Sequence, residues 1–281
     1  MKVSYYRFYW MSIALVLFGF RQPKNDLKIT YLANCGYLYE SDMEKVIIDP
    51  FGTEFGNFFY LPSAKTRTDI VQGNKPFENI DLLLITHIHG DHFNALLAEK
   101  FLLMNPKTKM ICPPQVYKQM RDSCIDIARI NSQIISPKID INASKKITVN
   151  GIKIMAIRMQ HGTDRSLEGI DSKDYTEYEK TENFGYVINI ENHNIFHQGD
   201  ACLKINREAL KRINRPVDIA YLSYFDWDSI SLNILKEEIK AKSVIFMHGT
   251  KPGKELSTEQ FQRIKPQLVF INQELESKIF N

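Results

Sequence analysis

Three of the chain's seven histidines lie within six residues, in the stretch "LLLITHIHGDHFN" at positions 82–94. Side chains on a strand point alternately to opposite faces, so His87 and His89 can face the same metal ion. The glycine after them lets the chain turn, and Asp91 and His92 then approach from another side, where they can hold a second ion. Because neutral imidazole and carboxylate are ligands of Zn²⁺ and similar divalent ions, the stretch predicts a metal site.

A metal site needs more ligands than one loop supplies, and four other segments can deliver them. "VIIDP" places Asp49, "IRMQHG" places His161, "NIFHQGD" places Asp200 and "VIFMHG" places His248 at or just after the end of an expected strand. Strand ends along one edge of a sheet are where such sites form in layered α/β folds. We therefore expect these four residues to meet the histidine cluster.

The ordered series of these residues, with "HIHGDH" after Asp49, resembles the five motifs of the metallo-β-lactamase superfamily over roughly residues 28–250. The resemblance implies an α/β fold, a four-layer αββα sandwich, with two metal ions on one edge. It also implies a hydrolase, because the redox branch has an acid in place of the second histidine. The residues that the resemblance assigns are His87, His89 and His161 at the first ion, Asp91, His92 and His248 at the second, Asp200 as the bridge, and Asp49 as support behind the ligands.

The branch of the superfamily is indicated by the opening stretches. "THIHGDH" is similar to the tRNA 3′-processing branch, but "FNALLAEK" stands where that branch has Gly-Leu-Pro-Gly. The glyoxalase branch has Pro-Gly-His where this chain has "RMQHG". "ITYLANCGYLYE" and "KVIIDPFG" are closer to the branch of ascorbate-phosphate lactonase and phospholipase-D-like enzymes, although Ala33-Asn34 replace its usual Gly-His.

These features together predict a dinuclear metal-dependent hydrolase with Asp91 and Asp200 as catalytic residues. Two divalent ions, Zn²⁺ in first place and Mn²⁺ or Fe²⁺ as alternatives, lower the pKa of a shared water. The bridging hydroxide would attack an ester, lactone or phosphodiester of a small molecule, and one of the two aspartates would carry a proton to the leaving group. Two alternatives are a non-catalytic metal- or ligand-binding protein on the same fold and an RNA-processing nuclease.

Residues outside the ligand series are candidates for supporting roles. The stretch "SYFDWD" leaves a strand at the expected edge, and its candidates for lining a substrate pocket are Tyr224, Asp226 and Trp227. His197, three residues before Asp200, suits either support behind a ligand or an ordinary strand position. His193, in the polar stretch "ENHN", is expected to be exposed.

The elements that must position these residues alternate along the chain. Apolar, β-branched runs predict strands, an Asn150-Gly151 hairpin turn joins two of them, and amphipathic runs predict helices between later strands. Two packed sheets with helices outside follow from this order. The expected strands are 27–40 (as two), 45–50, 81–86, 109–112, 146–160 (as a hairpin), 184–190, 194–198, 217–223 and 243–248. The expected helices are 94–104, one from about Pro114, 204–213, 231–241 and 257–264.

The N-terminus has the pattern of a leader. Lys2 and Arg7 precede the uncharged run 8–20, and Arg21 closes it. As a helix this run spans roughly 20 Å, short of the roughly 30 Å hydrocarbon core. We expect residues 1–21 to be a signal peptide or an N-terminal anchor that contacts the membrane, with a buried helix as the alternative. Residues 22–281 would then form one exported hydrolase domain, periplasmic or extracellular.

Composition is that of an ordinary globular protein. The 281 residues carry a formal net charge of +3 with dispersed basic residues, so no nucleic-acid partner is expected. Residues 163–183 are rich in acids and fit either a flap over the site or a solvated loop. No CxxC pair occurs, and either one or two disulfides or free thiols are expected of Cys35, Cys112, Cys124 and Cys202.

Overall fold

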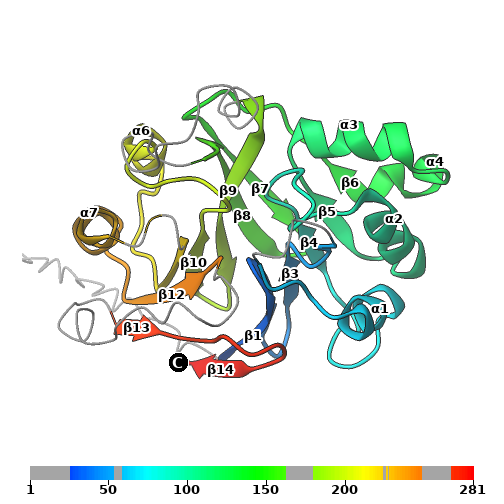
Figure 1. Cartoon of the computed structure of the whole chain (residues 1–281), viewed down its shortest axis with the longest axis horizontal. Coiled ribbons are helices and arrows are strands. Elements are labelled where there is room, and N and C mark those ends of the chain that lie inside the picture. The colour runs from blue at the N-terminus through cyan, green and yellow to red at the C-terminus, as the bar shows by residue number, and fades with distance from the viewer. Residues whose placement is uncertain (1–25, 54–58, 163–179, 224–225, 227, 249–266) are drawn as a thin grey trace, which may run out of the picture.

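Two seven-stranded sheets face each other, and helices cover their outer faces (Figure 1). The computed structural model describes residues 26–53, 59–162, 180–223, 226, 228–248 and 267–281. In spatial order the first sheet consists of β14 (Ser277–Phe280), β1 (Leu27–Ala33), β2 (Gly36–Glu40), β3 (Lys45–Ile48), β4 (Leu82–Leu84), β5 (Lys109–Ile111) and β6 (Ile134–Ile135). The second consists of β13 (Gln267–Val269), β12 (Ser243–Met247), β11 (Ile219–Ser223), β10 (His193–His197), β9 (Glu182–Ile190), β8 (Ile152–Gln160) and β7 (Ser144–Val149).

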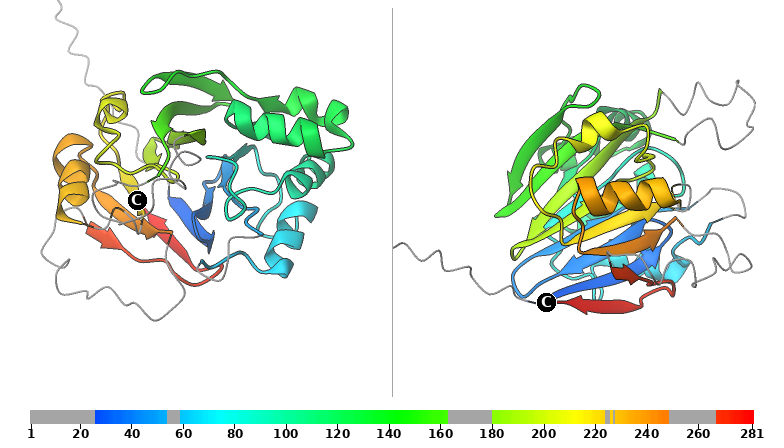
Figure 2. Two further views of the ribbon diagram at one scale, coloured as in Figure 1. Left: turned by 45° about the horizontal axis from the view of Figure 1, so that its top comes forward. Right: turned by 90° about the vertical axis from the view of Figure 1, so that its left-hand side faces the viewer.

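Three layers of buried apolar side chains separate four layers of structure. The first fills the space between the sheets, the second lies between the first sheet and its helices, and the third lies between the second sheet and its helices. Figure 2 shows the two groups of helices on opposite sides of the paired sheets. The predicted four-layer αββα sandwich is therefore confirmed. The helices are α1 (Ala64–Gln72), α2 (Ala95–Met104), α3 (Pro114–Ser123), α4 (Ile127–Ile130) and η1 (Asn131–Gln133) on the first sheet, and α6 (Arg207–Leu210), α7 (Ser229–Asn233) and η4 (Ile234–Glu238) on the second.

Strand periodicity places each central strand between two apolar layers. In β4, Leu82 and Leu84 point into the space between the sheets and Leu83 points toward the helices, so the whole apolar run is buried. The predicted β7–β8 hairpin turns at Asn150 and Gly151, both with positive φ (50° and 91°).

The strands that precede the predicted site residues run in the same direction within each sheet. β3, β4 and β5 are parallel neighbours, and so are β10, β11 and β12. The pairings β8–β9 and β9–β10 are both antiparallel, so β8 runs the same way as β10. A hydrogen bond from Phe184 N–H to the Thr86 carbonyl, 2.9 Å, joins the sheets at the edge where these strands finish.

Several predicted elements differ in length or identity. The helix expected over 204–213 is only the four-residue α6, and the helix expected over 231–241 begins earlier, as α7, and continues with the wider π-helical turn η4. Helix α1 and strands β6, β13 and β14 were not predicted, because short edge strands carry little periodic signal. Residues 1–21, the helix expected over 257–264, and most of 163–183 lie outside the described residues.

Two further observations bear on the sequence-based expectations. All four cysteines are free thiols, which is the second of the two alternatives that the sequence left open. No helix within the described ranges is both long and apolar enough to cross a bilayer.

Candidate metal centre

The loop that follows β4 brings three histidines to the edge of the sheets. His87 and His92 are fully buried, and His89 is partly exposed. The backbone N–H of His92 donates to the carbonyl of His89 at 3.0 Å, which closes a tight turn after the strand. Nε2 of His87 lies 3.2 Å from Nδ1 of His89, so both rings direct a nitrogen into the same space.

Asp49 and Thr86 orient two of these rings. The buried Asp49 carboxylate accepts from the Thr86 backbone N–H at 2.8 Å and from the Thr86 hydroxyl at 2.6 Å. The same carboxylate lies 2.8 Å from Nδ1 of His92, which must carry a proton to donate. Because the Thr86 hydroxyl has given its hydrogen to Asp49, it can only accept from Nδ1 of His87, 2.9 Å away. Both rings therefore leave Nε2 as the atom available to a metal.

Three further residues reach this edge from the second sheet. His161 follows β8, Asp200 follows β10 and His248 follows β12. The ring centre of His161 lies 4.7 Å from that of His87 and 4.6 Å from that of His89. Nε2 of His248 lies 3.1 Å from Oδ2 of Asp200. The strand ends thus bring residues from both halves of the chain into one cluster.

Asp200 stands between two groups of donor atoms. Its Oδ1 lies 3.2 Å from Nε2 of His92, and its Oδ2 lies 3.7 Å from Nε2 of His87 and 3.8 Å from Nε2 of His161. Within each group the donor atoms lie within 4.8 Å of one another. The first group contains His87, His89, His161 and Asp200, and the second contains Cys35, His92, His248 and Asp200; a third, overlapping one contains His87, Asp91 and His92.

The charges and donor types of this centre fit divalent cations. Asp49, Asp91 and Asp200 place three carboxylates in a largely buried region, where uncompensated negative charge is costly. Oδ1 of Asp91 is buried and forms no hydrogen bond within the described part of the chain. Imidazole nitrogens and carboxylate oxygens are donors that zinc and similar ions prefer. The residues therefore suit the metals that the sequence predicts.

The two groups differ in protonation. Burial lowers the pKa of His161 to about 3 and that of His87 well below its usual value, so both rings are neutral at pH 7. Burial also opposes charge on His92 and His248, but the carboxylates, Asp200 foremost, raise both pKa values, that of His248 to about 9. Without a metal, protons thus balance the carboxylates of the second group.

Comparison with known families agrees with this geometry. Residues 44–248 match the family model of the β-lactamase superfamily domain, which is most of the chain and includes all seven predicted ligands. The chain belongs to the metallo-β-lactamase superfamily.

Relatives of this superfamily member are named as hydrolases. A UPF0173 metal-dependent hydrolase of Pelotomaculum thermopropionicum is 30% identical over 240 residues, covering 84% of this chain and 90% of that protein. A UPF0173 metal-dependent hydrolase of Pyrococcus horikoshii is 24% identical over 242 residues, covering 85% and 92%. At this level the prediction of a metal-dependent hydrolase is confirmed.

Solved structures of the superfamily share the fold. Igni18, a metallo hydrolase from Ignicoccus hospitalis, superimposes with a TM-score of 0.63 at 18% identity, covering 91% of this chain and 99% of that one. The metallo-β-lactamase fold protein YhfI from Bacillus subtilis does so with a TM-score of 0.60 at 12% identity, covering 92% and 100%.

Two polar residues at the centre were not identified from the sequence. Asn34 donates from Nδ2 to Oδ2 of Asp91 at 2.9 Å, and Thr86 holds Asp49 as described above. The only sequence signal for Asn34 was its place where the related branch has a histidine. Thr86 carried no signal beyond its position at the end of the apolar run.

His197 holds the segment before Asp200 through hydrogen bonds to backbone groups. Its Nδ1 accepts from the Gly199 backbone N–H at 3.1 Å, so Nε2 carries the proton and donates to the Cys35 carbonyl at 3.0 Å. Burial lowers the pKa of His197 to about 4, which keeps the ring neutral. Of the two roles considered for His197, this arrangement is closer to indirect support.

Of the three candidates for lining a substrate pocket, only Asp226 lies among the described residues. Asp226 is fully buried, and its Oδ2 accepts from the Leu203 backbone N–H at 2.7 Å and from the Gln198 amide at 3.1 Å. The carboxylate thus points inward and stabilises the segment around Asp200 instead of lining a pocket. Tyr224 and Trp227 lie outside the described residues.

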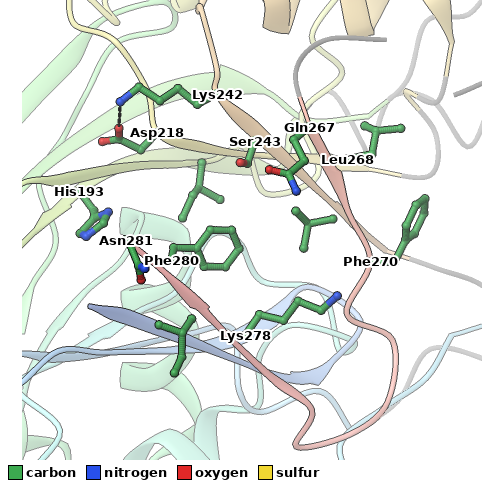
Figure 3. A pocket seen from close by; sticks show the side chains of 13 residues that line it. His193, Asp218, Lys242, Ser243, Gln267, Leu268, Phe270, Lys278, Phe280 and Asn281 are labelled. Carbon is green, nitrogen blue, oxygen red and sulfur yellow. Dashed lines mark hydrogen bonds and ion pairs between the residues drawn. The ribbon is translucent and has the colours of Figure 1, made fainter. Parts of the chain in front are cut away.

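His193 lies far from the centre and is buried, contrary to the expected exposure, because it begins β10 inside the sandwich. With Asp218, Lys242 and Gln267 it lines a cavity of about 560 Å³ at the opposite, amino-terminal ends of the parallel strands (Figure 3). None of the predicted ligands lines this cavity.

Proposed function

We propose that this protein hydrolyses an ester, lactone or phosphodiester of a small molecule at a centre that holds two divalent ions, Zn²⁺ in first place. The position of Asp200 carries the proposal, because its carboxylate lies within 4 Å of histidine nitrogens of both groups, with Oδ2 near His87, His161 and His248 and Oδ1 near His92. A carboxylate so placed can bridge two cations, and neither group is complete without it.

The chain's own residues would prepare the centre for this reaction. When bound, two divalent ions supply Lewis-acid chemistry and a nucleophilic water near neutral pH. Thr86 and Asp49 hold the rings of His87 and His92 with Nε2 inward. Oδ2 of Asp91 accepts a hydrogen bond from Asn34, and Oδ1 has no hydrogen bond in the described part of the chain. Oδ1 is therefore the oxygen that would take up and release a proton.

The site of action and the substrate class rest on the sequence. Residues 1–21 support export to the periplasm or the outside of the cell, with membrane contact if the segment is retained. The stretches around Ala33 and Asp49 support a small-molecule substrate over RNA, and so do the dispersed basic residues. A hydrolysis rate on small esters that is insensitive to salt would separate this proposal from a nuclease, whose binding weakens steeply with salt.

The experiment that tests the proposal measures metal content and turnover together. The protein is purified without chelator, its metals are counted by plasma mass spectrometry, and hydrolysis of a nitrophenyl ester, a lactone and bis(nitrophenyl) phosphate is assayed. We expect about two ions per chain and turnover of at least one substrate class. His87→Ala and Asp200→Asn should lose both.

A matched control comes from the histidine outside the centre. His193→Gln changes a buried histidine at the other end of the strands and should keep metal and turnover. Two ions without hydrolysis of any substrate class would favour the binding-protein alternative. Retained turnover in His87→Ala would refute the proposed centre.

A further inference from the structure

The turn between β1 and β2 is built into the metal centre. The carbonyl of Asn34 accepts from the backbone N–H of His248 at 3.2 Å, and its amide donates to Asp91 at 2.9 Å. The next carbonyl, that of Cys35, accepts from His197 at 3.0 Å. Three segments that hold or precede predicted ligands thus fix this turn.

The backbone of the turn leaves little freedom for the side chain of Cys35. Asn34 has a φ of 49°, a left-handed conformation that asparagine tolerates well. A Cβ at Gly36 would lie 2.8 Å from the carbonyl oxygen of Asp49, so only glycine lets β2 start this close to β3. Between these two constraints, Cys35 is 1% exposed with its thiol inside the sandwich.

The thiol of Cys35 lies beside the second group of donor atoms. Its Sγ is 3.9 Å from Oδ1 of Asp200, which is itself 3.2 Å from Nε2 of His92. Four donor atoms lie within 4.8 Å of one another here: Sγ of Cys35, a carboxylate oxygen of Asp200, and one ring nitrogen each of His92 and His248. Donor atoms around a tetrahedral zinc ion with bonds of about 2.0–2.3 Å stand roughly 3.3–3.6 Å apart. The 3.9 Å between Sγ and Oδ1 of Asp200 is within a few tenths of an ångström of that spacing, whereas the 4.8 Å limit for the whole group exceeds it by just over 1 Å, a gap that a bound ion would have to close by drawing the donors inward.

We propose that Cys35 supplies a sulfur ligand to the second metal position, beside His92, His248 and Asp200. This inference rests on the proposed dinuclear function and adds a donor that the sequence comparison does not assign. On metal binding the thiol's S–H bond is replaced by a sulfur–metal bond, and the proton leaves to solvent. A thiolate is a soft donor, so the second position should select Zn²⁺ over Mn²⁺, which prefers oxygen.

A purely structural role for Cys35 would need only a small apolar side chain. Its Sγ does contact the layer between the sheets, where a free cysteine behaves as a small hydrophobic residue. The two roles differ in whether a bound metal has a sulfur neighbour, and this can be measured without an activity assay.

The test is X-ray absorption spectroscopy at the zinc edge on the full chain loaded with Zn²⁺, together with the zinc count. One sulfur bound to only one of two zinc ions predicts an average of about half a sulfur neighbour per zinc at about 2.3 Å, the usual Zn–S distance. Cys35→Ser should lose this signal, and Cys35→Ala serves if the serine variant does not fold. Cys124→Ser is the matched control, because its thiol donates to the Ala95 carbonyl at 3.4 Å, a bond that serine can keep.

The outcomes separate the two proposals. Half a sulfur per zinc in the native protein and in Cys124→Ser, with none in the Cys35 variants, supports the ligand. Two zinc ions with only nitrogen and oxygen neighbours would overturn it while leaving the dinuclear centre standing, and so would a sulfur signal that survives in the Cys35 variants. Failure to bind zinc at all would overturn the proposed function and this inference together.

Discussion

Asp49→Asn should weaken metal binding although Asp49 is not one of the predicted metal ligands. The carboxylate accepts three hydrogen bonds, from the backbone N–H and hydroxyl of Thr86 and from Nδ1 of His92. An asparagine side chain has the same shape but only one acceptor oxygen, and its NH₂ group can only donate. At least one of the three donors must then face another donor, or the His92 ring must change its tautomer.

The cost follows from the burial and charge of this carboxylate. Asp49 is 2% exposed, so water cannot replace a lost partner. A hydrogen bond to a charged group contributes about 1.5–3 kcal/mol, and the free energy of unfolding should fall by about that amount. Changes behind a metal-binding histidine lower metal affinity by about 10–100-fold, so the second ion should bind correspondingly more weakly.

Two measurements check this expectation. Urea unfolding of the metal-free protein gives the free energy of unfolding, and competition with a chromophoric chelator gives the affinity of each ion. Asp81→Asn is the control, because the Asp81 carboxylate accepts one bond from the Lys45 N–H at 2.9 Å that an amide oxygen can also accept. If Asp49→Asn binds both ions as tightly as Asp81→Asn does, the carboxylate does not orient His92 and the reasoning is wrong.

Three further perturbations test other parts of the structure. Gly199→Ala should lower the free energy of unfolding by about 2–4 kcal/mol and release metal, because φ is 60° and the new Cβ would lie 2.4 Å from Oδ1 of Asn183. The control Gly151→Ala has a φ of 91° but open space around the new Cβ, so it should cost about 1–2 kcal/mol and keep the metal. Equal effects of the two variants in urea unfolding would contradict this. Asp226→Asn should keep turnover and remove a pH dependence of the protein's stability. Burial raises the pKa of Asp226, and neighbours such as Cys202, Leu203 and Lys204 lower it by less. The contribution of Asp226 to stability is therefore greatest below its unfolded pKa and falls as pH rises through the folded pKa. Thermal melts from pH 4 to 7 that decline equally in both proteins would exclude that role. Removing metal with EDTA should lower the melting temperature, and zinc at about 100 times its Kd should restore about 2.7 kcal/mol of stability; an unchanged melting temperature would argue against a metal bound to the folded state.

The position of the predicted ligands follows from local sequence, which is why it could be predicted. Each of His161, Asp200 and His248 follows an apolar strand, and parallel strands finish at one edge of a sheet. The hairpin at Asn150 and Gly151 is equally local. Elements without such local signals were missed, as β14 shows, because it becomes a strand only by pairing with β1 at the other end of the chain.

The polar residues behind the ligands could not be predicted, because they act across long separations in the sequence. Asn34 and Asp91 are 57 residues apart, and Asp49 and His92 are 43 apart. No periodic pattern joins such pairs, and an asparagine or aspartate after an apolar run is common in turns that hold no metal. The helix expected over 204–213 failed for a related reason: its first part is committed to contacts of the Asp200 segment, where Asn206 donates to the carbonyls of Gln160 and Cys202.

The segment that carries Asp200 is held by the buried side chains of Asn183 and Asp226, and this explains why Asp226 points inward. Asn183 accepts from the Asp200 N–H at 3.1 Å and donates to the Gln198 carbonyl at 3.0 Å. Asp226 accepts from the N–H of Leu203, three residues after Asp200. A carboxylate that contacts histidines of two groups at once cannot rely on its own strand for precise orientation, because β10 has ended three residues earlier. The strand end therefore determines where Asp200 lies, and the buried polar contacts determine which way it points.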